Sequence, residues 1–223
     1  ISRLTTTFTQ NPAISLYIHL PFCEQLCTYC GCNKRITKNH QVEHPYIDAL
    51  LKEWQLYLNQ LPFAPILKEV HLGGGTPTFF SPQQLERLMK GILAGAKMAP
   101  DHSFSFEAHP WSVTEEHMAT LSAIGFNRVS IGVQDFDPAI LSVINRRQTT
   151  EQVENVVKWS RTYGYDSLNF DLIYGLPLQK MEHIKRSMQY VQELQPDRIA
   201  FYSYAHVPWV SPSQRAYSVD DLP

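Results

Sequence analysis

The sequence has little of three features that mark particular classes of protein: charge of one sign, long apolar runs and dispersed cysteines. Its formal net charge is −2 over 223 residues, so no strong field favours a nucleic acid or an anionic membrane. No apolar run reaches the length of a transmembrane helix, and no charged-then-apolar leader indicates secretion. Hydrophobic residues make up 43% and charged residues 18%, which is ordinary for a globular protein. We therefore expect a cytoplasmic protein without nucleic-acid or membrane partners.

All four cysteines of the chain lie within ten residues, in the run PFCEQLCTYCGCNK. Cys23, Cys27 and Cys30 read C-x3-C-x2-C and directly follow a strand-like segment at 16–20. Three thiolates on one short loop can hold three corners of an iron–sulfur cube, which normally takes four protein thiolates. The missing fourth ligand leaves one iron open to a substrate or cofactor, as at catalytic metal sites.

Two other interpretations of the cysteines fit less well. A disulfide is disfavoured because nothing else in the sequence indicates a secreted, disulfide-rich protein. Structural zinc usually takes two C-x2-C pairs that lie a dozen or more residues apart, or a downstream pair of histidines. The crowded cysteines, together with His40 and His44, match neither spacing well. A zinc-stabilised binding module stays open as an alternative.

Strand-like runs alternate with helical patterns along the chain. Strands are expected at 16–20, 67–72, 103–107, 128–134, 167–172 and 198–202. Helices are expected at 42–58, from 82, at 114–124, 138–144, 151–163 and 181–194. We expect Ser81 to cap the helix that opens with Pro82. We expect Gly125 to end the helix at 114–124. Six strand–helix repeats predict a parallel sheet with right-handed crossovers.

The strands alternate between apolar and polar side chains. Phe104 and Phe106 face away from Ser105 and Glu107, and the strands at 16–20, 128–134 and 167–172 alternate in the same way. The strands of a doubly wound sheet are continuously apolar, and a closed eight-stranded barrel has an apolar interior. The alternation instead predicts an open or wide barrel with helices outside and a polar cavity inside. Ligands in such folds bind at the carboxyl ends of the strands, where the cysteines, glycines 73–75 and Glu107 fall.

The three-cysteine motif after the first of six strand–helix units resembles the radical S-adenosylmethionine (SAM) superfamily. The segments YIHLPFCEQLCTYCGCNK, HLGGGTPT, GVQDF, NFDLIYGLP and YAHVPW resemble the oxygen-independent coproporphyrinogen III oxidases, in the same order over essentially the whole chain. The resemblance implies an α/β fold, a partial (β/α)6 TIM-like barrel over 16–210. Residues 1–15 would be an N-terminal extension, and 211–223 would begin a connection to a C-terminal domain. We expect the chain to be a piece of a longer protein.

The resemblance also implies roles for individual residues. Cys23, Cys27 and Cys30 would ligate a [4Fe–4S] cluster whose fourth iron is chelated by SAM, whereas Cys32 would not be a ligand. Positions that contact this first SAM would be Tyr17, Gly74 and Glu107. Positions that contact a second SAM molecule would be Tyr29, Gly75, Thr76, Gln134, Arg146, Asp171 and Ala205. For Arg146 the residues alone also allow an ordinary solvated helix face, since Arg147 follows it.

The implied reaction converts coproporphyrinogen III into protoporphyrinogen IX. One electron from the cluster would cleave SAM, and the resulting 5′-deoxyadenosyl radical would take hydrogen from the β-carbon of a propionate. Loss of CO2 and one electron leaves a vinyl group, and two propionates react. No side chain is expected to act as a general acid or base. The resemblance further implies a monomer that uses an electron donor and an electron acceptor, neither of which the sequence identifies.

The sequence departs from this family at one strand end. Where the family commonly has E-V-D-P, this chain has Glu107-Ala108-His109-Pro110, so the local charge differs. A haem chaperone or haem-degrading relative that keeps the cluster stays open as an alternative function. Cys32 and the YAHVPW segment argue against it, because such chaperones usually lack a cysteine at that position.

Overall fold

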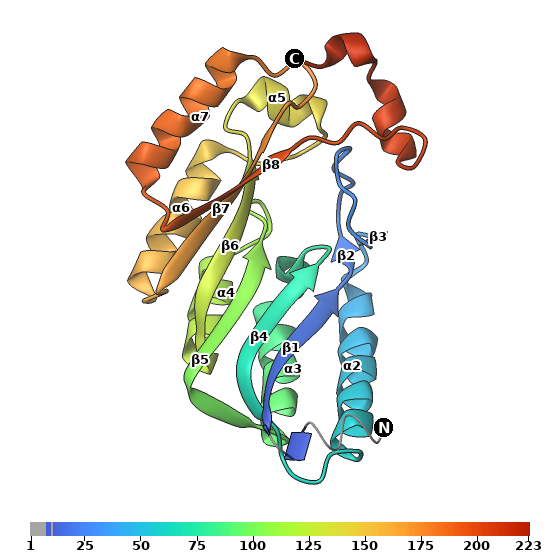
Figure 1. Ribbon diagram of the computed structural model, residues 1–223, viewed down its shortest axis with the longest axis vertical. Coiled ribbons are helices and arrows are strands. Elements are labelled where there is room, and N and C mark those ends of the chain that lie inside the picture. Colours follow the sequence, from blue (N-terminus) through green and yellow to red (C-terminus); the bar gives the residue numbers. More distant parts are fainter. Residues whose placement is uncertain (1–7, 10) are drawn as a thin grey trace.

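The computed structural model describes residues 8, 9 and 11–223 and contains one six-stranded parallel sheet (Figure 1). The strands follow the order β1–β4–β5–β6–β7–β8. Their bounds are Ala13–Leu20, Ile66–Gly74, Lys97–Ala108, Phe126–Gln134, Ser167–Tyr174 and Arg198–Ser203. Each expected strand is therefore present, and most are a few residues longer than predicted. Strand β1 begins at Ala13, inside the segment that was expected to be an extension.

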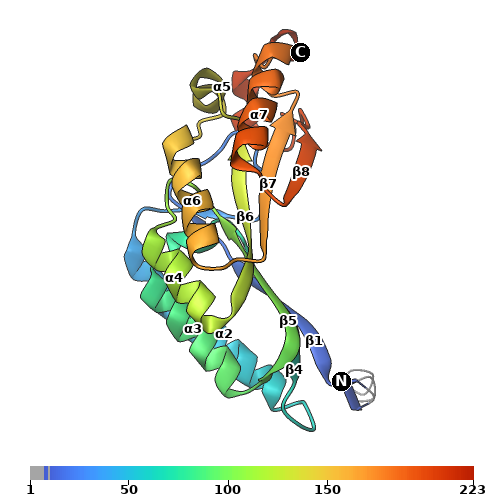
Figure 2. The same cartoon turned by 90° about the vertical axis from the view of Figure 1, so that its left-hand side faces the viewer.

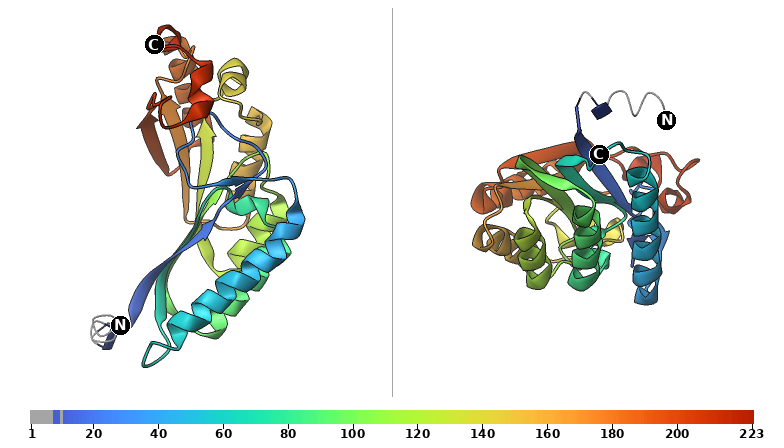
Figure 3. Two further views of the ribbon diagram at one scale, coloured as in Figure 1. Left: turned by 90° about the vertical axis from the view of Figure 1, so that its right-hand side faces the viewer. Right: turned by 90° about the horizontal axis from the view of Figure 1, so that it is seen from below.

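The helices follow the strands as predicted and cover one face of the sheet (Figures 2 and 3). They are α2 (Glu43–Leu58), α3 (Pro82–Ala94), α4 (Glu115–Ile124), α5 (Pro138–Val143), α6 (Thr150–Thr162) and α7 (Met181–Leu194). Short 3-10 turns lie at His40–Val42, Pro77–Phe79, Pro212–Ala216 and Val219–Asp221. None of the helices in the described part of the chain has the length and apolarity needed to cross a membrane.

The hydrophobic core lies between the sheet and these helices. Phe104, Phe106, Ile131 and Phe170 have no exposed surface, because their strand positions all point toward the helical layer. The intervening residues of the same strands point to the opposite, concave face and are polar. Burial of the apolar rows supplies the main driving force for folding, and it fixes the strand register that sends the polar rows inward. The alternation predicted from the sequence is confirmed.

The sheet is open along one side. Strands β1 and β8 are its two edges, and within the described residues they do not pair with each other. The arrangement is a partial barrel, as expected, and its concave face holds a polar cavity of about 390 Å³ lined by residues such as His71, Ser130 and Asn169.

Ser81 is the N-cap residue of helix α3, as predicted, but its expected side-chain cap is not formed. Ser81 has the extended backbone of an N-cap residue, but its side chain makes no capping bond to helix α3. Its Oγ and backbone N–H instead donate to Oε2 of buried Glu43, at 3.0 and 2.8 Å. A buried carboxylate needs donors more than the solvated end of a helix does, so it takes the hydroxyl. The predicted end of α4 at Gly125 is confirmed by its left-handed φ of 115°.

The last residues of the chain pack against the cysteine-bearing loop, at the top of Figure 1. The Tyr217 hydroxyl lies 2.8 Å from Thr28 Oγ1, and Ser213 Oγ donates to the Thr28 carbonyl at 3.0 Å. The Leu178 amide also donates to the carbonyl of Asp221 at 2.7 Å. Residues 211–223 therefore help to hold the loop.

Candidate functional site

The cysteine loop runs from β2 (Phe22–Cys23) to β3 (Arg35–Ile36), a short parallel pair beyond the end of β1. The turn after α5 holds the middle of this loop. Asn145 Nδ2 donates to the Leu26 carbonyl at 2.7 Å, and Gln25 Nε2 donates to Asn145 Oδ1 at 2.6 Å. The Thr28 amide donates to the carbonyl of Ile144 at 3.1 Å. These contacts place the loop over the carboxyl ends of the strands.

A cavity of about 370 Å³ lies beneath the loop, within the size range of small-molecule sites. It brings together most of the predicted site residues. Those that line it are Cys23, Cys27, Tyr29, Cys30, Gly74, Gly75, Thr76, Glu107, Gln134, Arg146 and Asp171.

Two predicted residues lie outside this cavity. The Tyr17 ring is 56% exposed and stacks on His71 at a centroid distance of 5.8 Å, beside the rim. Ala205 is exposed, and its carbonyl accepts a hydrogen bond from Gln214 Nε2 at 3.1 Å.

The thiols in the cavity have hydrogen-bond donors around them. Thr76 Oγ1 lies 3.3 Å from Cys23 Sγ, and Arg146 Nη1 donates to Cys27 Sγ at 3.6 Å. Burial raises the pKa of the Cys23 thiol, and the Thr76 hydroxyl partly offsets this. Interaction with the neighbouring Cys32 thiol lowers the pKa of Cys30 to about 6, whereas the same pairing raises the pKa of Cys32. Cys30 is therefore the readier of the two to act as a thiolate ligand.

The donor set fits an iron–sulfur cluster. Three thiols on one loop, with a hydroxyl and a guanidinium beside them, match the soft, anionic ligands that such clusters take. Among the described residues, no three His, Cys, Asp or Glu side chains are placed to hold a single metal ion. Gly75 forms part of the wall, because an added Cβ there would lie 3.0 Å from Cys23 Sγ.

Arg146 is buried beside the cysteines, whereas Arg147 is exposed. The Arg146 guanidinium donates to the Tyr29 hydroxyl at 3.1 Å, to Gln148 Oε1 at 2.8 Å, and to the carbonyl of Gly132. The solvated-face interpretation is therefore wrong for Arg146 and describes Arg147. A buried guanidinium with one face toward an open cavity is suited to binding a carboxylate.

Two carboxylates also line the cavity. Glu107 Oε2 accepts from the Gly74 amide at 3.3 Å, at the end of β4. Asp171 accepts from Ser130 Oγ at 2.9 Å and from Asn169 Nδ2 at 2.8 Å. Burial raises the pKa of Asp171. Carboxylates held by donors at a cavity wall can accept hydrogen bonds from an ammonium group or from ribose hydroxyls.

Sequence reasoning missed several residues of the cavity. Gly132 lies between two functional side chains, since an added Cβ would come within 2.9 Å of both Arg146 Nη2 and Gln134 Nε2. The alternation of β6 places Gly132 on the inner face and could have identified it. Lys34, His109 and Tyr202 also line the cavity. Lys34 Nζ donates to the Cys30 carbonyl at 2.8 Å.

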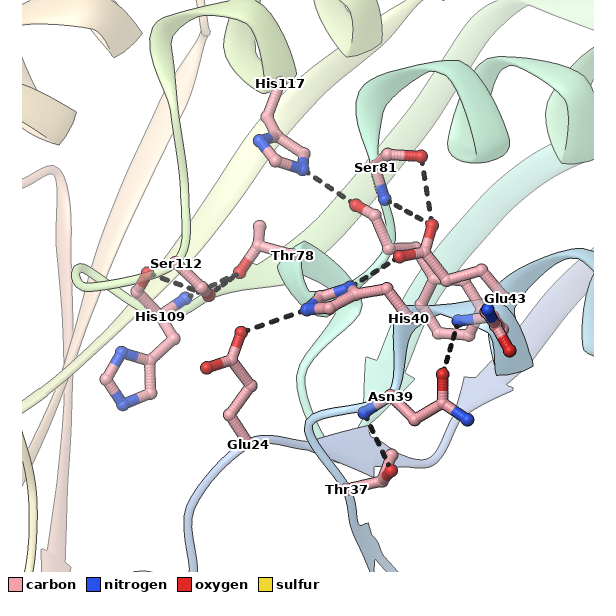
Figure 4. A network of polar contacts seen from close by, with 12 residues as sticks. Glu24, Thr37, Asn39, His40, Glu43, Thr78, Ser81, His109, Ser112 and His117 are labelled. Atoms are coloured by element: carbon pink, nitrogen blue, oxygen red, sulfur yellow. Dashed lines mark hydrogen bonds and ion pairs between the residues drawn. The ribbon is translucent and has the colours of Figure 1, made fainter.

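A polar network supports the outer side of the cysteine loop (Figure 4). His40 Nδ1 lies 2.7 Å from Glu43 Oε1, and His40 Nε2 lies 3.2 Å from Oε1 of Glu24, the residue after Cys23. The His40 ring stacks on Phe79 with centroids 4.4 Å apart. Burial opposes protonation of His40, but the two carboxylates raise its pKa overall. The network ties the loop to the start of α2.

Comparison with known proteins agrees with this geometry. The sequence profile described as "Radical SAM superfamily" matches residues 17–191. The chain belongs to the radical SAM superfamily. Membership implies a [4Fe–4S] cluster and SAM, and it favours the cluster over the zinc alternative for this chain.

The similar proteins are named for one activity. "Oxygen-independent coproporphyrinogen III oxidase" of Pseudomonas aeruginosa is 42% identical over 212 residues, which are 94% of this chain and 46% of that protein. The Helicobacter pylori (strain J99) protein of the same name is 44% identical over 216 residues, covering 96% of this chain and 47% of that protein. The solved structure titled "Coproporphyrinogen III oxidase (HemN) from Escherichia coli is a Radical SAM enzyme" superposes with a TM-score of 0.93. It has 37% identity and covers 100% of this chain and 52% of that one.

These comparisons confirm the resemblance predicted from the sequence. They also show that the chain spans about half the length of the curated relatives it matches.

Proposed function

We propose that this chain is the catalytic barrel of an oxygen-independent coproporphyrinogen III oxidase. The reaction would decarboxylate two propionate side chains of coproporphyrinogen III oxidatively and leave two vinyl groups. The observation that carries this proposal is the one cavity that Cys23, Cys27 and Cys30 line together with Glu107 and Asp171. The similarity to relatives of that name over nearly the whole chain supports it.

In this proposal Cys23, Cys27 and Cys30 hold the cluster, and Cys32 is not a ligand. A first SAM binds against Tyr17, Gly74 and Glu107. A second SAM binds against Tyr29, Gly75, Thr76, Gln134, Arg146, Asp171 and Ala205. The shared cavity supports the assignment for most of these residues, whereas for Tyr17 and Ala205 only the sequence resemblance does. The SAM-to-protein ratio at saturation, measured anaerobically, tests the number of SAM molecules.

The bound cluster and SAM would supply the one-electron chemistry that removes hydrogen from a propionate. The protein's own residues would bind and orient these groups and shield them from water. The Arg146 guanidinium, most of whose N–H groups bond to the protein, would attract a SAM carboxylate by its charge, and Glu107 and Asp171 accept bonds from ammonium or hydroxyl groups. The backbone at glycines 74 and 75 approaches the ligand closely because no Cβ intervenes. No side chain acts as a general acid or base.

The test is anaerobic reconstitution of the intact protein with iron and sulfide, followed by EPR of the dithionite-reduced state. A [4Fe–4S]+ signal that shifts when SAM is added would support the site. Formation of 5′-deoxyadenosine and protoporphyrinogen IX from coproporphyrinogen III would then support the substrate. Zinc binding without a cluster would contradict the whole proposal. Haem binding without 5′-deoxyadenosine would contradict only the decarboxylation and favour a haem chaperone.

The remaining expectations belong to the same proposal and rest on the resemblance. They are a cytoplasmic monomer, an electron donor and an electron acceptor, and barrel boundaries at 16 and 210. Residues 211–223 would lead into a further domain. Size-exclusion chromatography of the intact protein tests the monomer.

A further inference from the structure

His109 lies in the wall that carries two of the three cysteines. It follows the last residue of β5, two positions after Glu107. His109, Cys23 and Cys27 line the main cavity and also a small adjoining cavity of about 30 Å³ on its outer side. Glu107 and Asp171, the carboxylates assigned to SAM, line the main cavity and the polar cavity of the concave face, but not this small one. The imidazole therefore belongs to the cysteine side of the site.

The backbone around His109 is fixed by hydrogen bonds. Its N–H donates to Thr78 Oγ1 at 3.3 Å, and its carbonyl accepts from the amides of Ser112 and Val113, both at 3.0 Å. The ring points away from Thr78 and Ser112 (Figure 4). Since the backbone cannot shift easily, the ring has a defined place in the cavity wall.

The tautomer of His109 is also set. The Trp111 amide donates to His109 Nδ1 at 3.2 Å, so Nδ1 carries the lone pair and Nε2 carries the proton. Burial, followed by the nearby Arg146 charge, holds the pKa of His109 well below its usual value. Within residues 8, 9 and 11–223, no hydrogen-bond acceptor pairs with the Nε2–H. The ring is thus a neutral donor without a partner among the described residues.

We propose that His109 Nε2–H donates a hydrogen bond to a sulfur of the [4Fe–4S] cluster and raises its reduction potential. The inference rests on the proposed cluster site. Thr76 and Arg146 already lie beside the Cys23 and Cys27 sulfurs, and His109 adds a third donor on the same wall. Hydrogen bonds to cluster sulfurs favour the more negative, reduced state. A neutral donor does this without adding a charge to the cavity.

The experiment compares the intact, anaerobically reconstituted protein with His109→Leu, His109→Gln and His109→Asp. EPR-monitored redox titration without SAM gives the midpoint potential of each cluster. Loss of one such bond should lower the ratio of reduced to oxidised cluster about tenfold at a fixed potential, or about 59 mV for one electron. Gln restores an N–H donor at similar reach and should recover most of that shift. Asp adds a negative charge and should lower the potential further than Leu.

The outcomes separate this inference from the proposed function. An unchanged potential in His109→Leu, or a Gln variant that behaves like Leu, would overturn the assignment. Weaker SAM binding with an unchanged potential would also overturn it, by placing the imidazole against SAM. If the unsubstituted protein assembles no cluster, the cluster site itself fails. Urea denaturation of each variant identifies any that do not fold. If His109→Leu does not fold, the midpoint potentials of His109→Gln and His109→Asp still test the inference, since the Asp variant should have the lower potential.

Discussion

Replacing Gly75 by alanine should damage both the fold and the cluster site. An added Cβ would lie 2.5 Å from the Pro21 carbonyl oxygen and 2.6 Å from its carbon. The clash is with backbone, so no side-chain rotation relieves it. The Pro21 carbonyl accepts from the Arg35 amide at 2.8 Å, and its retreat would weaken that bond. Pro21 precedes the β2 strand that ends at Cys23, so the displacement reaches the first cysteine directly.

The expected cost follows from these contacts. Overpacking of this kind costs about 1–3 kcal/mol, and a weakened backbone hydrogen bond adds about 1 kcal/mol. A total of about 3 kcal/mol would lower the urea midpoint of the metal-free protein by roughly 1 M, for a slope near 3 kcal/mol per M. Iron bound per protein after anaerobic reconstitution should fall as well, because Cys23 no longer sits in register with the other cysteines.

Gly31→Ala is the matched control in the same loop. A Cβ at Gly31 would meet no atom within 4 Å, so the free energy of unfolding should stay within about 0.5 kcal/mol of that of the unsubstituted protein. A Gly75→Ala protein with unchanged midpoint and full iron content would refute the reasoning. Equal damage from both substitutions would refute it too, since the effect would then not come from the contact with Pro21.

Three further predictions concern other parts of the molecule. Cys30→Ser should abolish the EPR signal of the reconstituted cluster, whereas Cys32→Ser should keep it; loss of the signal in both would contradict the ligand assignment. Arg146→Met should destabilise the protein by about 3 kcal/mol in urea denaturation, because Tyr29 and the partly buried Gly132 carbonyl lose their donor. The matched change Arg147→Met should cost under about 0.5 kcal/mol. Equal costs for the two variants would show that the loss of stability does not come from the burial of Arg146. Burial lowers the pKa of His117 in the folded protein, so the buried neutral imidazole contributes its full stability above the pKa of the unfolded chain, about 6.5. That stability is lost as the pH falls below that value, because the unfolded chain then binds a proton that the folded protein does not. His117→Gln should therefore flatten the decline in the urea midpoint between pH 7.5 and 5.5, and an unchanged decline would assign it to other groups.

The fold could be predicted from the sequence because its signals are local. The alternation around Phe104 and Phe106 fixes which face of β5 is buried, and neighbouring strands repeat the pattern. The left-handed Gly125 marks the end of α4. Ser81 shows where local reasoning fails, since its hydroxyl is taken by Glu43, 38 positions earlier in the chain. No local pattern reveals a buried carboxylate that needs a donor.

The site residues that belong to a short sequence motif could be predicted. Those whose direction depends on the backbone conformation of a turn could not. The three cysteines and the glycine run at 73–75 are short local motifs, and the cavity is lined by the cysteines and by glycines 74 and 75. Arg146 and Arg147 are equivalent in sequence terms. The structure separates them because Asn145 has a left-handed φ of 52°, which ends the α5 turn and sends Arg146 inward. Gln134, at φ 68°, turns into the same cavity by a similar departure from the strand.

The contacts that hold the cysteine loop come from far along the chain. Asn145 and Arg146 reach Leu26 and Cys27 across 119 positions in each case. Closing the chain over that distance costs entropy, which the packing of the barrel must offset. The cysteine loop is therefore held by the barrel as well as by contacts within its own sequence. Arg146, the donor to Cys27, belongs to the turn between α5 and α6, while the thiols lie beyond β1 and Thr76, the partner of Cys23, lies beyond β4. The site therefore exists only where these separate parts of the chain meet.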